Sequence, residues 1–111
     1  MRTTDKLELI ALDGVHPNQQ VYALKGPLTL GNLFIVKEAL HSTAPVLVLD
    51  LAGVPFVDSA GIGVLVQCAA SRAKQGKRLV LTAPNDMVTK IFKVTKVDSL
   101  LETFPTLDAV T

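Results

Sequence analysis

The sequence predicts an α/β fold, with a mixed β-sheet that opens as an antiparallel hairpin, continues as parallel βα units and has helices packed on it. Two strand-like segments near the N-terminus are joined by a short loop of turn-forming residues, which favours antiparallel pairing. After them, short apolar strands alternate with segments of helical periodicity, which is typical of βα units. The chain has 111 residues, 49% of them hydrophobic, so we expect one domain, 1–111.

The predicted hairpin is formed by two segments at the start of the chain. In 6–14 (KLELIALDG), Leu7, Leu9 and Ala11 share one face of a strand. The residues that follow, DGVHPNQ, are rich in turn formers. The segment 20–26 (QVYALKG) then forms the second strand, which ends before a Gly-Pro pair.

Helices and strands alternate through the rest of the chain. The expected elements are a helix in 30–42, a strand in 44–51, a helix that runs to about Gln75, a strand in 77–84, a helix in 85–94, and a short edge strand with the start of a last helix in 99–110. The strand 44–51 is continuously apolar, as in a strand buried on both faces. Gly76 is a natural stop for the second helix. In the third helix, we expect Met87, Ile91 and Val94 to share the packed side.

The stretch VPFVDSAGIG joins the apolar strand to the second helix and holds the main candidate site. Asp58 and Ser59 lie where the helix begins, and either side chain can cap its unpaired backbone N–H groups. A cap does not require Gly61 and Gly63, because glycine costs a helix interior about 0.8–1 kcal/mol relative to alanine. The glycines indicate a close approach to the backbone. A phosphoryl group on Ser59 would also suit a helix start, where free donors and the helix dipole favour anions.

The second helix has one predicted packed side and one predicted free side. At about 3.6 residues per turn, the packed side holds Ile62, Leu65, Val66, Ala69 and Ala73, and the opposite side holds Ala60, Gly61, Val64, Gln67, Cys68, Ser71 and Gln75. The free side lacks charge, and Val64 and Cys68 lie there one turn apart, beside Ser59. A docking surface fits this pattern, and so does an ordinary exposed apolar residue.

The segment LVLDLAGVPFVDSAGIGVLVQCAASRAKQGKRLVLTAP resembles the STAS domain of anti-sigma factor antagonists. In that family an apolar strand and a loop lead to an Asp-Ser-small-Gly-aliphatic-Gly motif that opens a helix, and a strand follows after Gly-Lys or Gly-Arg. Here the motif is 58–63. The resemblance extends to VYALKGPLTL and to FKVTKVDSLLETFPTLDAV, and thus covers nearly the whole chain.

The resemblance implies a STAS-type fold and a non-enzymatic regulator that works by partner switching. Members of the family bind a serine kinase that also inhibits a sigma factor. The kinase phosphorylates the serine after the Asp, the phosphorylated antagonist lets go, and a PP2C-type phosphatase resets it. Carried over, Ser59 is the phospho-acceptor. Together with the free helix side, the resemblance implies a partner-binding set of Asp58, Ser59, Ala60, Gly61, Val64 and Cys68.

The chain departs from the family pattern in three segments. Many antagonists read Gly-Glu-Leu-Asp after the second strand, whereas this chain reads GPLT and has Thr29 in place of the Asp. Ala60 replaces the Ser or Thr that often follows the acceptor, and Lys96 stands where a Gly is common. The alternative function is that of a STAS subunit in another assembly, such as a stressosome-like scaffold or a lipid-transport complex, with no sigma factor downstream.

Two enzyme-like classes fit less well. An acyl hydrolase needs a Gly-x-Ser-x-Gly turn, but Val57 occupies the first glycine position, and the candidate bases His16 and His41 both precede the serine. A response-regulator receiver would use Asp50 as its acceptor, but it needs an acidic pair after its first strand, where this chain turns into a hairpin. No spacing typical of a metal or nucleotide site is present, so we expect no cofactor and no metal.

Charge and composition bound the partners and the compartment. The net charge of +1 gives no sign of a surface for nucleic acid or anionic lipid. The start MRTTDKLELI carries charges where a signal peptide needs an apolar core, and no run reaches the roughly 20 apolar residues of a membrane span. The lone cysteine fits a reducing compartment. We therefore expect a cytoplasmic protein that binds neither membrane nor nucleic acid.

Overall fold

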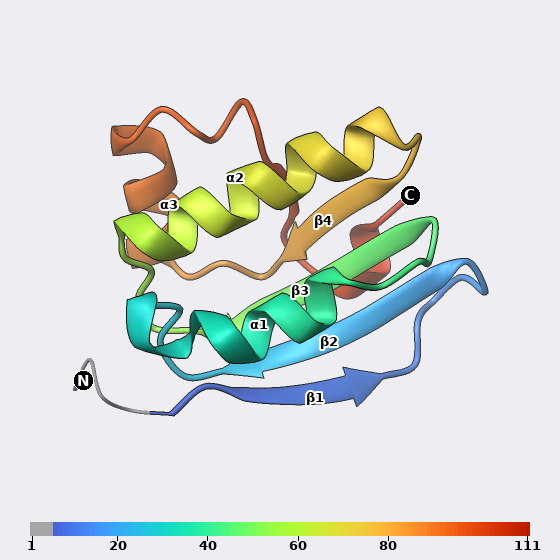
Figure 1. Cartoon of the computed structure of the whole chain (residues 1–111), viewed down its shortest axis with the longest axis horizontal. Coiled ribbons are helices and arrows are strands. Elements are labelled where there is room, and N and C mark those ends of the chain that lie inside the picture. The colour runs from blue at the N-terminus through green and yellow to red at the C-terminus, as the bar shows by residue number, and fades with distance from the viewer. Residues whose placement is uncertain (1–5) are drawn as a thin grey trace.

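The computed structural model describes residues 6–111, which fold around a five-stranded sheet with the order β1-β2-β3-β4-β5 (Figure 1). The strands are β1 (Glu8–Leu12), β2 (Gln19–Lys25), β3 (Val46–Gly53), β4 (Arg78–Thr82) and β5 (Glu102–Phe104). The helices are α1 (Leu33–Leu40), α2 (Ser59–Lys74) and α3 (Asp86–Val94), with short 3₁₀ turns η1 (Leu30–Asn32) and η2 (Leu107–Ala109). β1 pairs antiparallel with β2, and every later pair is parallel. The predicted mixed α/β fold is confirmed.

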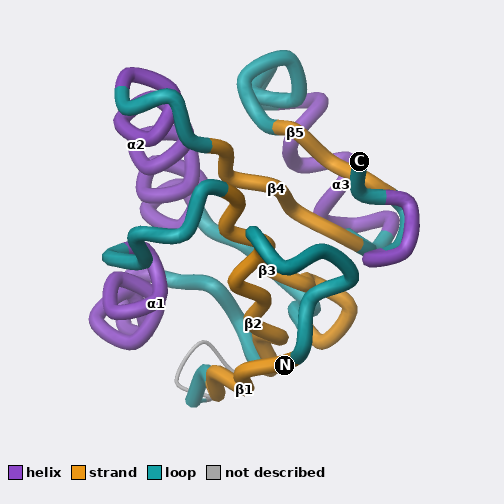
Figure 2. Tube along the Cα trace, turned by 90° about the vertical axis from the view of Figure 1, so that its right-hand side faces the viewer, coloured by secondary structure: helices purple, strands orange, loops and turns teal. Residues whose placement is uncertain are grey.

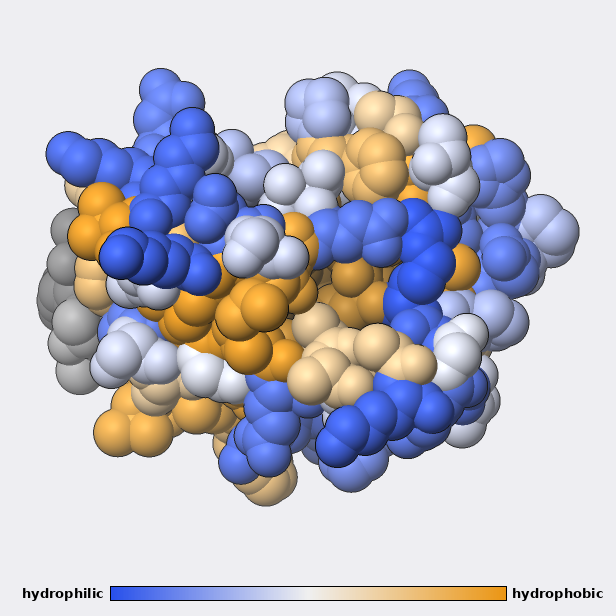
Figure 3. Space-filling model, turned by 90° about the horizontal axis from the view of Figure 1, so that it is seen from above, coloured by the Kyte–Doolittle hydropathy of each residue, from blue (hydrophilic) through white to orange (hydrophobic). Residues whose placement is uncertain are grey.

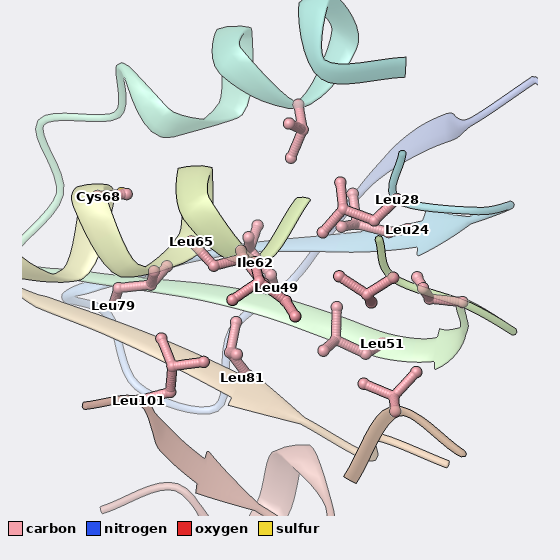
Figure 4. Packing of buried hydrophobic residues seen from close by; sticks show 14 of the residues in the cluster. Leu24, Leu28, Leu49, Leu51, Ile62, Leu65, Cys68, Leu79, Leu81 and Leu101 are labelled. Carbon is pink, nitrogen blue, oxygen red and sulfur yellow. The ribbon is translucent and has the colours of Figure 1, made fainter. Parts of the chain in front are cut away.

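The helical face of the sheet carries the larger core. Leucines 47, 49 and 51 of β3 point to this face because alternate residues of a strand share one side, and all three are fully buried. α1 and α2 lie on this side of the strands (Figure 2), and α3 adds Val88 and Phe92 to the same cluster. Leu65 and Ile62 of α2 point from the helix towards the sheet (Figure 4).

The opposite face of the sheet is covered by the C-terminal segment. Val21, Val48 and Val80 lie side by side on adjacent strands and face this side. Val110 packs on them and is only 2% exposed, and Phe104 adds a partly buried ring. β5 and η2 confirm the expected short strand and last helical turn. β3 is therefore buried on both faces, as its continuous apolar run predicts.

The predicted packed side of α3 is wrong. Met87 and Val94 are 56% and 70% exposed, whereas Val88 and Phe92 are buried and Ile91 is half-buried. These three inward residues form an i, i+3, i+4 stripe that includes the one aromatic side chain of the helix. Burying that ring removes more apolar area from water than burying Met87 or Val94 would.

Candidate functional site

The predicted site lies at the edge of the sheet where the parallel strands β2 and β3 have their carboxyl ends. The residues after β2 run beside the loop that follows β3, where Leu28 forms a parallel bridge with Val57. The Leu28 N–H donates to the Phe56 carbonyl at 3.0 Å, and the Asp58 N–H donates to the Leu28 carbonyl at 3.2 Å. These bonds fix the loop just before α2 begins at Ser59.

Asp58 is the N-cap of α2, one of the two alternatives for the start of this helix. Its backbone is extended, and its Oδ1 accepts from the Gly61 N–H at 2.8 Å. Its Oδ2 accepts from the Leu30 N–H at 3.0 Å, so the same carboxylate also holds the start of η1. The half-buried Asp58 is thus fully engaged with backbone, and its chemical role here is positioning.

Ser59 is exposed at the first position of α2. Within residues 6–111, its hydroxyl has no hydrogen-bond partner, because Asp58 supplies the cap. A side chain in this setting is accessible to a second protein, and a negative charge placed on it would lie near the positive end of the α2 dipole. The geometry suits a modification acceptor.

Gly61 and Gly63 have different structural roles. A Cβ on Gly61 would lie 3.0 Å from both Leu28 Cγ and Val57 Cγ1, and closer still to the Leu28 carbonyl oxygen. The close approach expected at this glycine therefore comes from the chain itself, between α2 and the segment after β2. A Cβ on Gly63 would meet no atom within 4 Å, because this position faces solvent.

The predicted orientation of α2 is wrong for two residues of the proposed binding set. Gly61 and Cys68 are buried rather than free, and so is Arg72. Figure 4 shows Cys68 on the side of α2 that faces α1. Burial raises the pKa of the Cys68 thiol, and the nearby Arg72 charge only partly opposes this shift. Ala73, expected on the packed side, is exposed. The helix packs on the sheet and on α1 at once, so it has two buried sides.

The surface that remains open around Ser59 includes residues that the sequence reasoning did not select. Ala60 and Val64 are half-exposed on α2. In the segment η1–α1, Leu30 and Phe34 are 71% and 79% exposed, and the Leu30 N–H is the group bound by Asp58. Phe34 is an apolar residue outside the buried face of its helix. This position is the sequence signal that could have identified it as a surface residue. Figure 3 shows hydrophobic residues gathered between hydrophilic ones on the face of the molecule that it draws.

In the part of the chain that the structure describes, no three His, Cys, Asp or Glu residues are grouped so that they could hold a metal ion. Among the helices of residues 6–111, none combines the length and the hydropathy needed to cross a bilayer.

The comparison with family models gives a match to the STAS domain over residues 11–110. The chain belongs to the STAS domain family. A Thermotoga maritima protein assigned as an anti-sigma factor antagonist has 20% identity to this STAS domain and a TM-score of 0.79, over 90% of this chain and 88% of that one. An anti-sigma factor antagonist from Mycobacterium paratuberculosis has 20% identity and a TM-score of 0.75, over 97% and 93% of the two chains.

Solved structures similar to this STAS domain also include a transport protein. A sulfate transporter family protein from Wolinella succinogenes has 23% identity and a TM-score of 0.70, over 86% of this chain and 84% of that chain. At these levels of identity the three similarities show a shared fold. The STAS fold therefore occurs in proteins of different function, and the function has to be argued from the site.

Proposed function

We propose that this STAS domain is a cytoplasmic, non-enzymatic anti-sigma factor antagonist, and that phosphorylation of Ser59 controls its binding to a serine-kinase anti-sigma factor. The observation that carries the proposal is the exposed Ser59 hydroxyl, which Asp58 leaves unpartnered by taking the cap of α2 for itself. The similarity in fold to anti-sigma factor antagonists supports it.

The proposed binding surface surrounds Ser59. It consists of Ser59, Ala60 and Val64 on α2 and of the exposed Leu30 and Phe34 in η1 and α1, and Asp58 ties the start of α2 to the start of η1. Small side chains on α2 let a partner approach the helix closely, and the two exposed apolar side chains supply area that water solvates poorly. Gly61 and Cys68 leave the surface because both are buried.

The proposed switch is a change of charge at the centre of this surface. The kinase transfers the γ-phosphoryl group of ATP to Ser59 Oγ: the new O–P bond forms, ADP leaves, and the hydroxyl proton passes to a base of the kinase. This adds about −1.5 to −2 charges. Burying them against a partner without a cation costs several kcal/mol, and even about 3 kcal/mol weakens binding more than a hundredfold. A PP2C-type phosphatase reverses the change by hydrolysis.

The acceptor is tested with the serine-kinase anti-sigma factor of the same genome and ATP. We expect one phosphate, mapped to Ser59 by mass spectrometry, and none on Ser59→Ala. Ser71→Ala is the matched control, since Ser71 is an exposed serine of the same helix, and it should be phosphorylated like the wild type. Phosphate on Ser71, or on the buried Thr29, would refute the assignment.

The surface is tested by calorimetry with the same kinase. Val64→Lys and Phe34→Lys should each weaken binding with little loss of thermal stability, because neither side chain is fully buried. Val94→Lys is the control, since Val94 is 70% exposed at the far end of α3. Equal weakening by all three variants would point to a general charge effect and would contradict the surface.

The fold similarity to the sulfate transporter family protein supports a second candidate, a STAS subunit of another assembly with no sigma factor downstream. A pull-down with the tagged domain, followed by mass spectrometry, separates the two. A serine kinase among the captured proteins favours the antagonist. Capture of transport components, and no binding to the purified kinase, favours the second candidate.

A further inference from the structure

A groove lies between α1 and α2, and its lining reaches Val64, one residue of the surface proposed around Ser59. Its volume is about 440 Å³, within the range of small-molecule sites in proteins, about 300–1,000 Å³. One wall comes from the end of α1 and the turn after it, including Lys37, Leu40 and His41. The other comes from α2, including Val64 and Arg72. The groove thus offers a wall on each side of an occupant.

Arg72 places a buried positive charge in this groove. It is only 4% exposed, and its guanidinium donates to the carbonyls of Ser42, Ala44 and Arg78. These three bonds use three of the five N–H groups, so two donors remain. Carbonyl dipoles carry no net charge, and the ion pair found within residues 6–111 is the one between Arg78 and Glu102. The Arg72 charge is therefore buried without a carboxylate, which is rare in proteins.

The groove has no acidic side chain to balance that charge. Lys37 and Lys77 line it together with Arg72, and no Asp or Glu of the described residues does. Glu38 follows Lys37 on α1 but is exposed and does not line the groove. The Ser42 and Ala44 carbonyls, which would repel an anion, are already bound by Arg72. The lining therefore favours an anionic occupant.

We propose that the groove between α1 and α2 binds a small organic anion, whose carboxylate or phosphate group is held by Arg72, Lys37 and Lys77. Leu40 and Val64 provide the apolar contacts for the body of the ligand. Charge-assisted hydrogen bonds from a guanidinium and two ammonium groups are the chemistry that proteins use for such groups. The groove shares Val64 with the surface proposed around Ser59, but its test needs neither phosphorylation nor the kinase.

The test is a titration of the ¹⁵N-labelled protein with citrate and, separately, with phenyl phosphate, at constant ionic strength. We expect saturable amide shifts confined to the end of α1, the turn after it and the middle of α2. Lys37→Gln combined with Lys77→Gln should weaken binding about tenfold or more. Lys90→Gln combined with Lys93→Gln is the matched control, since both lysines are exposed on α3 and neither lines the groove. This control should bind like the wild type.

The two probes identify the group that the groove recognises. Saturation by citrate alone assigns a carboxylate ligand, and saturation by phenyl phosphate alone assigns a phosphate ligand; both outcomes support the proposal. Shifts that do not saturate, or equal loss of binding in both double variants, would overturn it. Binding of a hexaglutamate peptide without binding of either small probe would overturn it as well, in favour of an acidic protein segment.

Discussion

The Asp58 carboxylate joins the start of α2 to a segment 28 residues before Asp58, since Oδ2 accepts from the Leu30 N–H while Oδ1 caps α2 at Gly61. Asp58→Ala removes both bonds and should lower the free energy of unfolding by about 1–3 kcal/mol. Asp58→Asn should cost less, because its amide oxygen can still cap Gly61, whereas its NH₂ group cannot accept from Leu30. Urea denaturation measures the free energy of unfolding of the wild type and of the two variants. An Asn variant as stable as the wild type would show that the Leu30 bond contributes nothing.

Gly61 and Gly63 provide a second prediction at this scale, because the same substitution has opposite effects two residues apart. Gly61→Ala forces a Cβ against the Leu28 carbonyl and should destabilise the protein, although alanine is the better helix former. Gly63→Ala meets no atom within 4 Å and should stabilise α2 by about 0.5–1 kcal/mol. Thermal melts of the two variants check the pair. A stabilised Gly61→Ala would contradict the packing of α2 on the Leu28 segment.

Among the helices, α2 shows what the sequence could and could not predict. Its start, its end before Gly76 and its contact with the sheet through Leu65 follow from local patterns, and the structure has all three. The burial of Cys68 and Arg72 does not follow, because periodicity defines an apolar stripe but not the number of neighbours. Here α1 forms a second neighbour, and backbone carbonyls that are distant in sequence accommodate the arginine. Which residues around Ser59 stay exposed depends on the same tertiary contacts.

The burial of Cys68 can be measured by alkylation. At pH 8 iodoacetamide should modify the folded protein at least about tenfold more slowly than the protein unfolded in urea, because burial blocks access and raises the pKa of the thiol. Raising the pH should speed the reaction, since deprotonation supplies the thiolate. Equal rates in the folded and unfolded protein would contradict the burial of Cys68 and support the outward orientation that the sequence pattern predicted.

Leu65→Ala truncates a fully buried side chain of the same helix. It should lower the free energy of unfolding by about 2–5 kcal/mol.

For the molecule as a whole, the position of Ser59 predicts a switch without refolding. Ser59 is exposed and its hydroxyl has no hydrogen-bond partner in residues 6–111, so a charge there disturbs no packed group. Ser59→Glu should leave the melting temperature nearly unchanged and move amide resonances only at the start of α2 and in the adjoining loops. The same variant should bind the kinase more weakly. Widespread shifts across the sheet would argue for a conformational mechanism instead.

The C-terminal cover on the sheet has a consequence for the order in which the chain can fold during synthesis. β2, β3 and β4 are complete by residue 82, but their second face is covered by Phe104 and Val110, which are synthesised after all three strands. Until those residues emerge, Val48 and Val80 present a bare apolar strip to the cell, and such strips attract chaperones and other nascent chains. Helices α1 and α2 can dock on their own face much earlier. The nascent chain therefore passes through a one-sided sheet, and this interval ends only after Val110 has emerged and packed on the valines.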